Sequence, residues 1–482
     1  MSATTEAIST LPVGSTRTAG LRKWALMPVV LAGVSMVVLD FFIVNVAMPT
    51  MQVDLHAGAN AIQWVIASYG LAFAAGLITG GRLGDQLGRR RMFSIGLALF
   101  VLTSAACGIA PSSEALIAAR AAQGLSSALL MPQVLAILGV AYTGADRLKA
   151  LTAYAMTLGI AAVSGQLIGG VLIQLDPAGL DWRACFLVNV PVGLAALAFV
   201  RRTVPESRGG DSRLDLVGAD LVTLGLIAIL VPLIEGRDHG WPAWTWMSFA
   251  AGALLLGVFA LYQRHVVARG GSPLVHPELF AERAFTAGLA TVVVFYATVA
   301  SFFLVLALEL QEGRGLDALD SGLVFAFEGL GFLVTTMTAG ALVARFGRQV
   351  LAVGALVRAA ALVGLYFAAG HVGAHGSVAW LAAALVLDGA GMGLVMGPII
   401  TMVVTNVAPK HAGAASGVLS SVQQVGIALG VALIGVVFFG ALDAGDAVVD
   451  AFRQSVLWLA AGSVVVAVLI QALPGRRRTE TA

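Results

Sequence analysis

The chain has 482 residues, of which 59% are hydrophobic and only 11% are charged, and its formal net charge is +2. A soluble protein of this size could not cover so much apolar surface, so the composition excludes a soluble globular protein and indicates a polytopic membrane protein. The small net charge points to no particular partner. The two cysteines, Cys107 and Cys185, show no metal-site or disulfide spacing and are interpreted as small buried residues.

Fourteen apolar runs are long enough for helices that cross a membrane, which takes about 20 residues. They lie near residues 25–49, 62–80, 92–110, 115–141, 150–175, 184–200, 216–235, 244–263, 284–308, 321–344, 349–369, 378–405, 412–440 and 453–473. No secretory signal is evident before the first run, because residues 1–20 are polar and the run is too long for one. The sequence therefore predicts an all-α protein with fourteen transmembrane helices.

Positive residues collect on one side if the spans alternate from a cytoplasmic N-terminus. The segments that then face the cytoplasm hold 22 of the 28 Lys and Arg residues, and those that face outward hold four. Since Lys and Arg concentrate in cytoplasmic loops, this asymmetry predicts that both termini are cytoplasmic. No lysine directly follows a glycine, so the phosphate-binding loop G-x-x-x-x-G-K-[ST] is absent. Uphill transport would need an ion gradient or a separate ATPase subunit.

Two segments 259 residues apart resemble each other. GRLGDQLGRRR (Gly81 to Arg91) joins spans 2 and 3, and GALVARFGRQV (Gly340 to Val350) joins spans 10 and 11. Parallel repeats are typical of transporters that work by alternating access. We therefore predict two six-helix bundles, a linker that holds spans 7 and 8, and two cytoplasmic tails. Their predicted bounds are 25–201 and 284–473 for the bundles, 202–283 for the linker, and 1–24 and 474–482 for the tails.

Five motifs, in chain order, carry a family resemblance. They are LDFFIVNVAMP (39–49), GRLGDQLGRRR (81–91), LIAARAAQGLSSA (116–128), WRACFLVNVPVG (182–193) and PLVHPELFAERAF (273–285). With them the chain resembles, over nearly its whole length, the fourteen-span drug:proton antiporters of the major facilitator superfamily. The resemblance implies a non-enzymatic exporter of drugs, antibiotics or secondary metabolites in the cell membrane. It would work by alternating access, with the proton gradient as its energy source and no cofactor or metal.

Span 5 departs from the pattern G-x-x-x-G-P-x-x-G-G of these antiporters. The run AAVSGQLIGG keeps Gly165, Gly169 and Gly170, but Gln166 replaces the proline and Ala161 replaces the first glycine. The remaining glycines still allow close helix packing. Gln166 is then free to reach the cavity.

The charged loop between spans 2 and 3 is the predicted cytoplasmic gate. Its arginines, Arg89 and Arg90 among them, set the topology, whereas acids orient spans only weakly, so Asp85 needs another role. Gly81 and Gly88 let backbones approach and turn. In the resembling family this loop latches the two halves together in the outward-open state, and we expect Asp85 and Arg89 to do so here.

Five ionisable residues lie clearly inside predicted spans, where charges mark functional sites by default. They are Asp40, Arg120, Glu328, Arg358 and Asp388. At a rise of about 1.5 Å per residue, Asp40 and Arg120 reach nearly the same depth, so Arg120 could neutralise Asp40 directly or through Asn45 or Gln123. We expect the pair to carry proton coupling, as the resemblance also implies for these helices. A static salt bridge is the alternative.

The remaining acids are candidates for a substrate site or a second proton site, together with Asn45, Gln123 and Gln166. Glu328 stands among Phe325, Phe327 and Phe332, which suits a lipophilic cation, or it pairs with a neighbouring helix. Asp388 would be structural if it pairs with Arg358, and otherwise a proton or cation site. Glu309 and Glu312, at the outer end of span 9, are expected to be solvated.

We expect a monomer whose partners are a lipophilic small molecule, protons and membrane lipid, with no nucleic acid. Two other functions stay open. A proton symporter could import a small organic solute on the same fold, although the span-5 glycines and the number of spans argue against it. A non-transporting sensor or scaffold would leave Asp40 and Arg120 individually dispensable.

Overall fold

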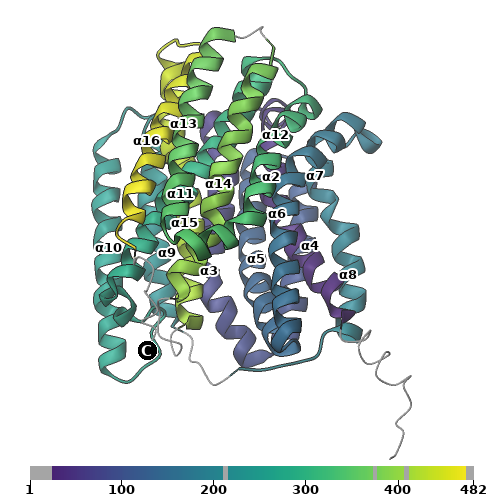
Figure 1. The fold of residues 1–482 in the computed structure, drawn as a ribbon, viewed down its shortest axis with the longest axis vertical. Helices are drawn as coiled ribbons and strands as arrows, with labels where there is room; N and C mark the ends of the chain where they lie inside the picture. Colours follow the sequence, from purple (N-terminus) through teal and green to yellow (C-terminus); the bar gives the residue numbers. More distant parts are fainter. Residues whose placement is uncertain (1–23, 210–214, 373–376, 406–411, 474–482) are drawn as a thin grey trace, which may run out of the picture.

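The computed structural model describes residues 24–209, 215–372, 377–405 and 412–473. Most of the described chain is helical and contains no strand, and the long helices run side by side in a single bundle (Figure 1). The helices of the first half are α2 (Leu26–Asp54), α3 (Ala59–Leu87), α4 (Arg89–Gly108), α5 (Ser113–Ala141), α6 (Gly144–Leu175), α7 (Ala184–Leu187) and α8 (Asn189–Thr203). The others are α9 (Leu216–Glu235), α10 (Ala243–Ala268), α11 (Arg283–Leu308), α12 (Ala318–Phe346), α13 (Gln349–Val372), α14 (Ala379–Thr405), α15 (Ala412–Asp443) and α16 (Val448–Ile470).

Thirteen helical segments of the described chain are long and apolar enough to cross a membrane. A fourteenth span results if the two arms of α6, Lys149–Ala162 and Ser164–Leu175, count as one span with a bend of 41°. The bend needs no proline, because Gly165 lies beside it and glycine is a common cause of helix bending. The predicted all-α fold is therefore confirmed, with thirteen or fourteen candidate spans in the described chain, and the cytoplasmic placement of both termini stays a prediction.

Several helices begin before the predicted apolar run because a polar residue caps them. The Ser112 side chain accepts the Ala115 N–H at the start of α5, and Asp317 accepts the Asp320 N–H at the start of α12. Such caps satisfy amides that have no partner within the helix. Hydropathy alone does not detect these turns, since they lie outside the hydrocarbon core.

The packing of the first spans recurs in the last ones. Helix α2 packs against α6 and α8 as α11 packs against α15 and α16, and α3 packs against α5 as α12 packs against α14. Between the two sets, α3 packs against α15 and α6 against α12. Helix α9 lies against both α3 and α15, whereas α10, at the edge of the bundle in Figure 1, packs mainly against α9. The residue bounds of the two bundles stay a prediction.

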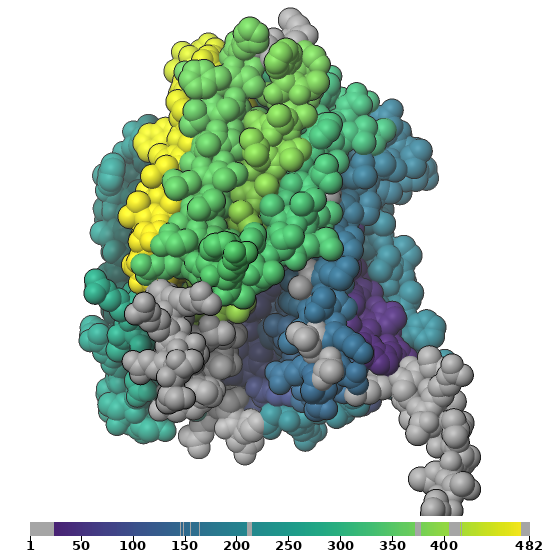
Figure 2. Space-filling model, viewed as in Figure 1, coloured from purple at the N-terminus to yellow at the C-terminus, as the bar shows by residue number. Residues whose placement is uncertain are grey.

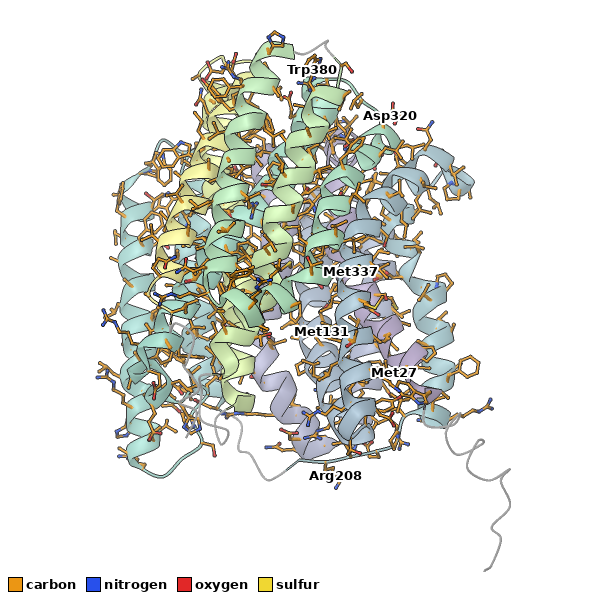
Figure 3. All side chains as sticks on the ribbon, viewed as in Figure 1. Met27, Met131, Arg208, Asp320, Met337 and Trp380 are labelled. Carbon is orange, nitrogen blue, oxygen red and sulfur yellow. The ribbon has the colours of Figure 1, made fainter. Side chains whose placement is uncertain are left out.

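The two ends of the bundle carry different residues. Figure 3 places Arg208 at the lower end and Asp320 and Trp380 at the upper end. We call the lower end the arginine-rich end, because Arg89, Arg90 and Arg91 bond to the segment that leads to Arg208; it is the end predicted to face the cytoplasm. Asp215 caps the start of α9. Its carboxylate accepts hydrogen bonds from the Gly218 N–H and from the Gln263 side chain of α10. Burial alone would raise the pKa of Asp215, but these hydrogen bonds outweigh it and hold the pKa below its ordinary value.

Candidate functional site

A buried polar network in the first half surrounds Asp40 of α2. Arg120 of α5 donates to Asp40 Oδ2 at 2.5 Å. Gln123 and Asn189 donate to Asp40 Oδ1 at 2.9 and 3.0 Å. Both charged side chains are almost completely buried. The predicted pairing of Asp40 with Arg120 is confirmed, and each oxygen of this carboxylate has a donor.

The same network fixes the position of Arg120. Its Nε donates to the Val65 carbonyl of α3 at 3.1 Å, and its guanidinium carbon lies 4.2 Å from the centre of the Tyr69 ring. Ser104 of α4 accepts from Gln123 at 2.8 Å. The ion pair is therefore surrounded by groups from five helices, α2, α3, α4, α5 and α8. A buried ion pair is stable only if hydrogen bonds from such groups replace its lost hydration.

Sequence reasoning found only part of this network. Asn45, expected as an intermediary, instead donates to the Phe42 carbonyl of its own helix at 3.1 Å. Asn189 and Ser104 were missed. The sequence does mark each of them as a polar residue inside an apolar run. Because both are far from Asp40 in the chain, nothing in the sequence indicated that they contact it.

A second buried network lies in the other half, around Asp388 of α14. Arg358 of α13 donates from Nε to Asp388 Oδ1 at 3.2 Å. Its other nitrogens donate to the Thr298 hydroxyl of α11 at 3.3 Å and to the Thr298 carbonyl at 3.2 Å. Arg358 and Asp388 therefore pair, which gives Asp388 a structural role through one oxygen. Its other oxygen, Oδ2, is buried without a hydrogen-bond donor among the described residues.

Glu328 of α12 lies against this free side of Asp388. Glycines make this approach possible, since a Cβ atom at Gly389 would collide with the Glu328 carbonyl and one at Gly331 with the Val386 carbonyl. Both carboxyl oxygens of Glu328 are buried and receive no donor from the described part of the chain. Two carboxyl groups thus share one arginine, and a proton held between them would supply the missing donor.

Glu328 also lines a cavity between the two halves, where about 390 Å³ of space, part of it open solvent, is not filled by atoms. The cavity is walled by α2, α6, α11, α12 and α14 through the residues Phe42, Ala162, Gln166, Val299, Phe303, Phe325, Glu328, Gly329, Phe332, Met392 and Met396. Aromatic rings and flexible thioethers suit varied apolar ligands.

The aromatic surroundings expected for Glu328 are correct in part. Phe325 and Phe332 line the cavity, but Phe327 is 42% exposed on the outer surface. Residues three and four positions apart share a helix face, whereas a neighbour one position away points elsewhere. The expectation for Phe327 is therefore wrong.

Helix α6 reaches the cavity through Gln166, and the glycines around it make close contacts. A Cβ atom at Gly165 would lie 2.9 Å from Phe42 Cβ, and one at Gly169 would lie 2.8 Å from Ile43 Cγ1, both on α2. On the other side, a Cβ atom at Gly170 would collide with the Ala318 carbonyl of α12. The close packing expected of the three glycines is confirmed. Gln166 lines the cavity, as expected, and its role there stays a prediction.

Contacts between the halves close the cavity toward the end opposite the arginine-rich one. The rings of Phe42 and Phe303 meet edge to face with centroids 5.1 Å apart. Gln311, in the π-helical turn η4 (Glu309–Gly313), donates across the halves to the Val46 carbonyl at 2.9 Å. In Figure 2 the surface is hollowed below the middle of the face shown, between the green helices above and the blue helices at the lower right.

The expectation that Glu309 is solvated is wrong. Its side chain is fully buried and pairs with Arg314 at 3.0 Å, whereas Glu312 is exposed. The π-helical turn changes the direction of the side chains from that of a regular helix, so the end of the apolar run did not reveal which acid points inward.

The charged loop is bound to its own half and to the linker, where Arg82 donates to the carbonyls of Ser272 and Pro273. Asp85 pairs with Arg89 at 2.9 Å, and the Glu206 carboxylate accepts the backbone N–H of Arg90 at 3.0 Å and of Arg91 at 3.2 Å. These amides begin α4, where an acid is favourable. Gly88 has a φ of 109°, which favours glycine, and Gly81 faces Pro132 of α5. The expected latch to the other half is not among these contacts and stays a prediction for another conformation.

Comparison with known proteins agrees with this architecture. The family model described as Major Facilitator Superfamily matches residues 30–431 and 287–482. The probable actinorhodin transporter of Streptomyces coelicolor is 36% identical over 87% of this chain and 73% of its own length. Puromycin resistance protein pur8 of Streptomyces alboniger is 37% identical over 91% and 86%. Multidrug resistance protein Stp of Mycobacterium tuberculosis is 32% identical over 86% and 75%.

Solved structures share the fold at low sequence identity. A POT family transporter in complex with 5-aminolevulinic acid has a TM-score of 0.66 and 15% identity, over 92% of this chain and 95% of the other. The peptide transporter POT in complex with sulfate has a TM-score of 0.67 and 16% identity, over 93% and 94%. At this level of identity the likeness shows the fold alone.

Proposed function

This chain belongs to the major facilitator superfamily and is a multi-pass membrane transporter, and we propose that it exports lipophilic small molecules in exchange for protons. The proposed substrates are drugs, antibiotics or secondary metabolites. The names of the relatives, which refer to resistance and to antibiotic transport, support this direction of transport. The proposed working unit is a monomer.

One observation carries the proposal: an acid without a hydrogen-bond donor stands in an apolar cavity between the halves. Both Glu328 oxygens lack a donor among the described residues, while Phe325 and Phe332, about one turn away on the same helix, line the same cavity. A lipophilic cation would gain a negative partner and aromatic faces there. The alternative occupant is a proton between Glu328 and Asp388. Substrate and proton would then exclude each other, which is what exchange requires.

Asp40 and Arg120 are proposed to couple proton movement to the change of conformation. In this structure the Asp40 carboxylate is paired and holds α2 to α5. A proton on Asp40 would cancel its charge and weaken the attachment of α2, which also contributes Phe42 to the closed side of the cavity. The structure would accordingly correspond to the inward-facing state, in which substrate enters from the cytoplasm and no enzymatic step is needed.

Proton flux in inside-out vesicles tests this function. Vesicles that contain the protein are energised to an acidic lumen, and lipophilic cations and antibiotics are added outside while a dye reports lumenal pH. Export by exchange predicts that the lumen becomes more alkaline on addition of substrate. Alkalinisation only when substrate is loaded inside would indicate a symporter. No response in either arrangement, across the panel, would contradict proton-coupled transport of these compounds.

Neutralising the charged loop is expected to shift the balance between conformations. If Asp85 latches the halves in the outward-facing state, Asp85→Asn should reduce that population about 5- to 10-fold, which corresponds to a loss of about 1–1.5 kcal/mol. Spin labels at the exposed residues Leu87 and Phe346, one in each half, would report the distance between the halves. A distance distribution and a transport rate both equal to those of the wild type would exclude the latch.

A further inference from the structure

Gln166 has an unusual place in the wall of the cavity. It is 1% exposed, and both its amide oxygen and its amide nitrogen are buried without a hydrogen-bond partner in the described chain. An amide that makes no hydrogen bond in an apolar environment is unfavourable, because it has lost its hydrogen bonds to water without replacement. A residue that lines a cavity and whose amide lacks these partners is suited to a ligand that supplies them.

The packing of α6 keeps the amide in this position. Gly165 lies against α2, and Gly170 lies against the backbone of α12. The backbone of Gln166 itself is in close contact with α12, since a Cβ atom at Gly322 would lie 2.8 Å from the Gln166 carbonyl. Held on both sides, α6 cannot rotate to turn the side chain away. The cavity is therefore the space into which a partner for the amide must come.

Glu328 is the second polar side chain of the same cavity, and it comes from the other half. The rest of the wall is formed mainly by phenylalanine and methionine side chains. A ligand in this cavity meets an amide donor and acceptor from α6 and a carboxyl group from α12, with aromatic surfaces between them.

We propose that Gln166 is a specificity-determining residue of the exporter. Together with Glu328 it selects molecules with an aromatic body, a cationic group for the carboxylate, and a carbonyl, hydroxyl or amide group for Gln166. This inference rests on the proposed export function and narrows it. Aromatic cations without a hydrogen-bonding group bind through Glu328 and the rings alone and gain nothing from Gln166.

Two probes of equal charge test the inference. One is a hydroxyanthraquinone that bears an aminoalkyl group, and the other is tetraphenylphosphonium, which has no hydrogen-bonding group. Gln166→Met keeps the length of the side chain and removes the amide. We expect it to lower the transport efficiency for the anthraquinone about 10- to 100-fold. Transport of tetraphenylphosphonium should stay the same or rise, which also shows that the variant is folded.

A matched control in the same helix is Ser164→Ala, since the partner of the Ser164 hydroxyl in the described part of the chain is the Ala161 carbonyl of its own helix. It should leave both probes unaffected. Should Gln166→Met not fold, Gln166→Asn is the second variant. It shortens the side chain by one methylene and should again lower transport of the anthraquinone alone. An equal loss for both probes, or no loss, would overturn the role of Gln166 while export stands. If the wild-type protein exports neither probe, the proposed function and this inference fail together.

Discussion

Glu328→Gln is expected to lower export of a lipophilic monocation about 100-fold, the effect of removing one partner of a buried pair of opposite charges, worth roughly 3 kcal/mol. Glutamine has nearly the shape of glutamate, so the cavity between Phe325 and Phe332 keeps its form. What disappears is the negative charge and the ability to exchange a proton. Drug-dependent proton flux in vesicles and direct binding of the cation would measure the two losses separately.

Glu312 provides the matched control for Glu328. It is an acid of the same type, but it is exposed at the end of the bundle and does not line the cavity. Glu312→Gln should leave cation transport at the wild-type level. If Glu328→Gln transported the monocation as well as Glu312→Gln does, the cation would have to bind elsewhere and the assignment of the cavity would be wrong.

Asp40→Asn is expected to abolish proton-driven export while substrate binding in the cavity persists. Asparagine cannot take up a proton, so the switch between a paired and a released α2 is lost. Asp40 does not line the cavity, and its partners Arg120, Gln123 and Asn189 all lie in the first half. Binding to the purified protein, compared with transport in energised vesicles, separates the two effects.

The Asp40→Asn variant leaves the buried charge of Arg120 without its partner, and this effect needs its own control. Removing one partner of a buried ion pair costs about 3–5 kcal/mol, so Asp40→Asn alone should also lower thermal stability. The double variant Asp40→Asn with Arg120→Gln removes both charges and should recover much of that stability. We expect its export to stay lost. Recovery of export together with stability would identify Asp40 and Arg120 as a static salt bridge.

Much of the fold could be predicted because each helix that crosses a membrane needs about 20 apolar residues. The run predicted at 216–235 is α9 from its first residue to its last, and the run at 284–308 differs from α11 by one residue. The depth of a residue in the membrane also follows from its position in the span, because a helix rises by about 1.5 Å per residue. For that reason Asp40 and Arg120, 80 positions apart, could be brought to the same height and expected to pair.

The rest of the candidate site depends on how helices face one another, and hydropathy carries no such information. Glu328 meets Asp388 only because Gly331 and Gly389 let α12 and α14 touch along their backbones. Phe327 was placed beside Glu328 from its position in the chain, although it lies on another helix face. Glu309 is buried at the start of a π-helical turn, and nothing in a hydrophobic run indicates such a turn.

The exchange of a proton for substrate at Glu328 is the central claim, and proton release on binding tests it most directly. The purified protein is mixed with a lipophilic monocation in weakly buffered solution near neutral pH, and released protons are counted with a pH dye. The account predicts release of close to one proton for each cation bound by the wild type and none by Glu328→Gln. Cation binding without proton release in the wild type, or undiminished release in Glu328→Gln, would contradict it.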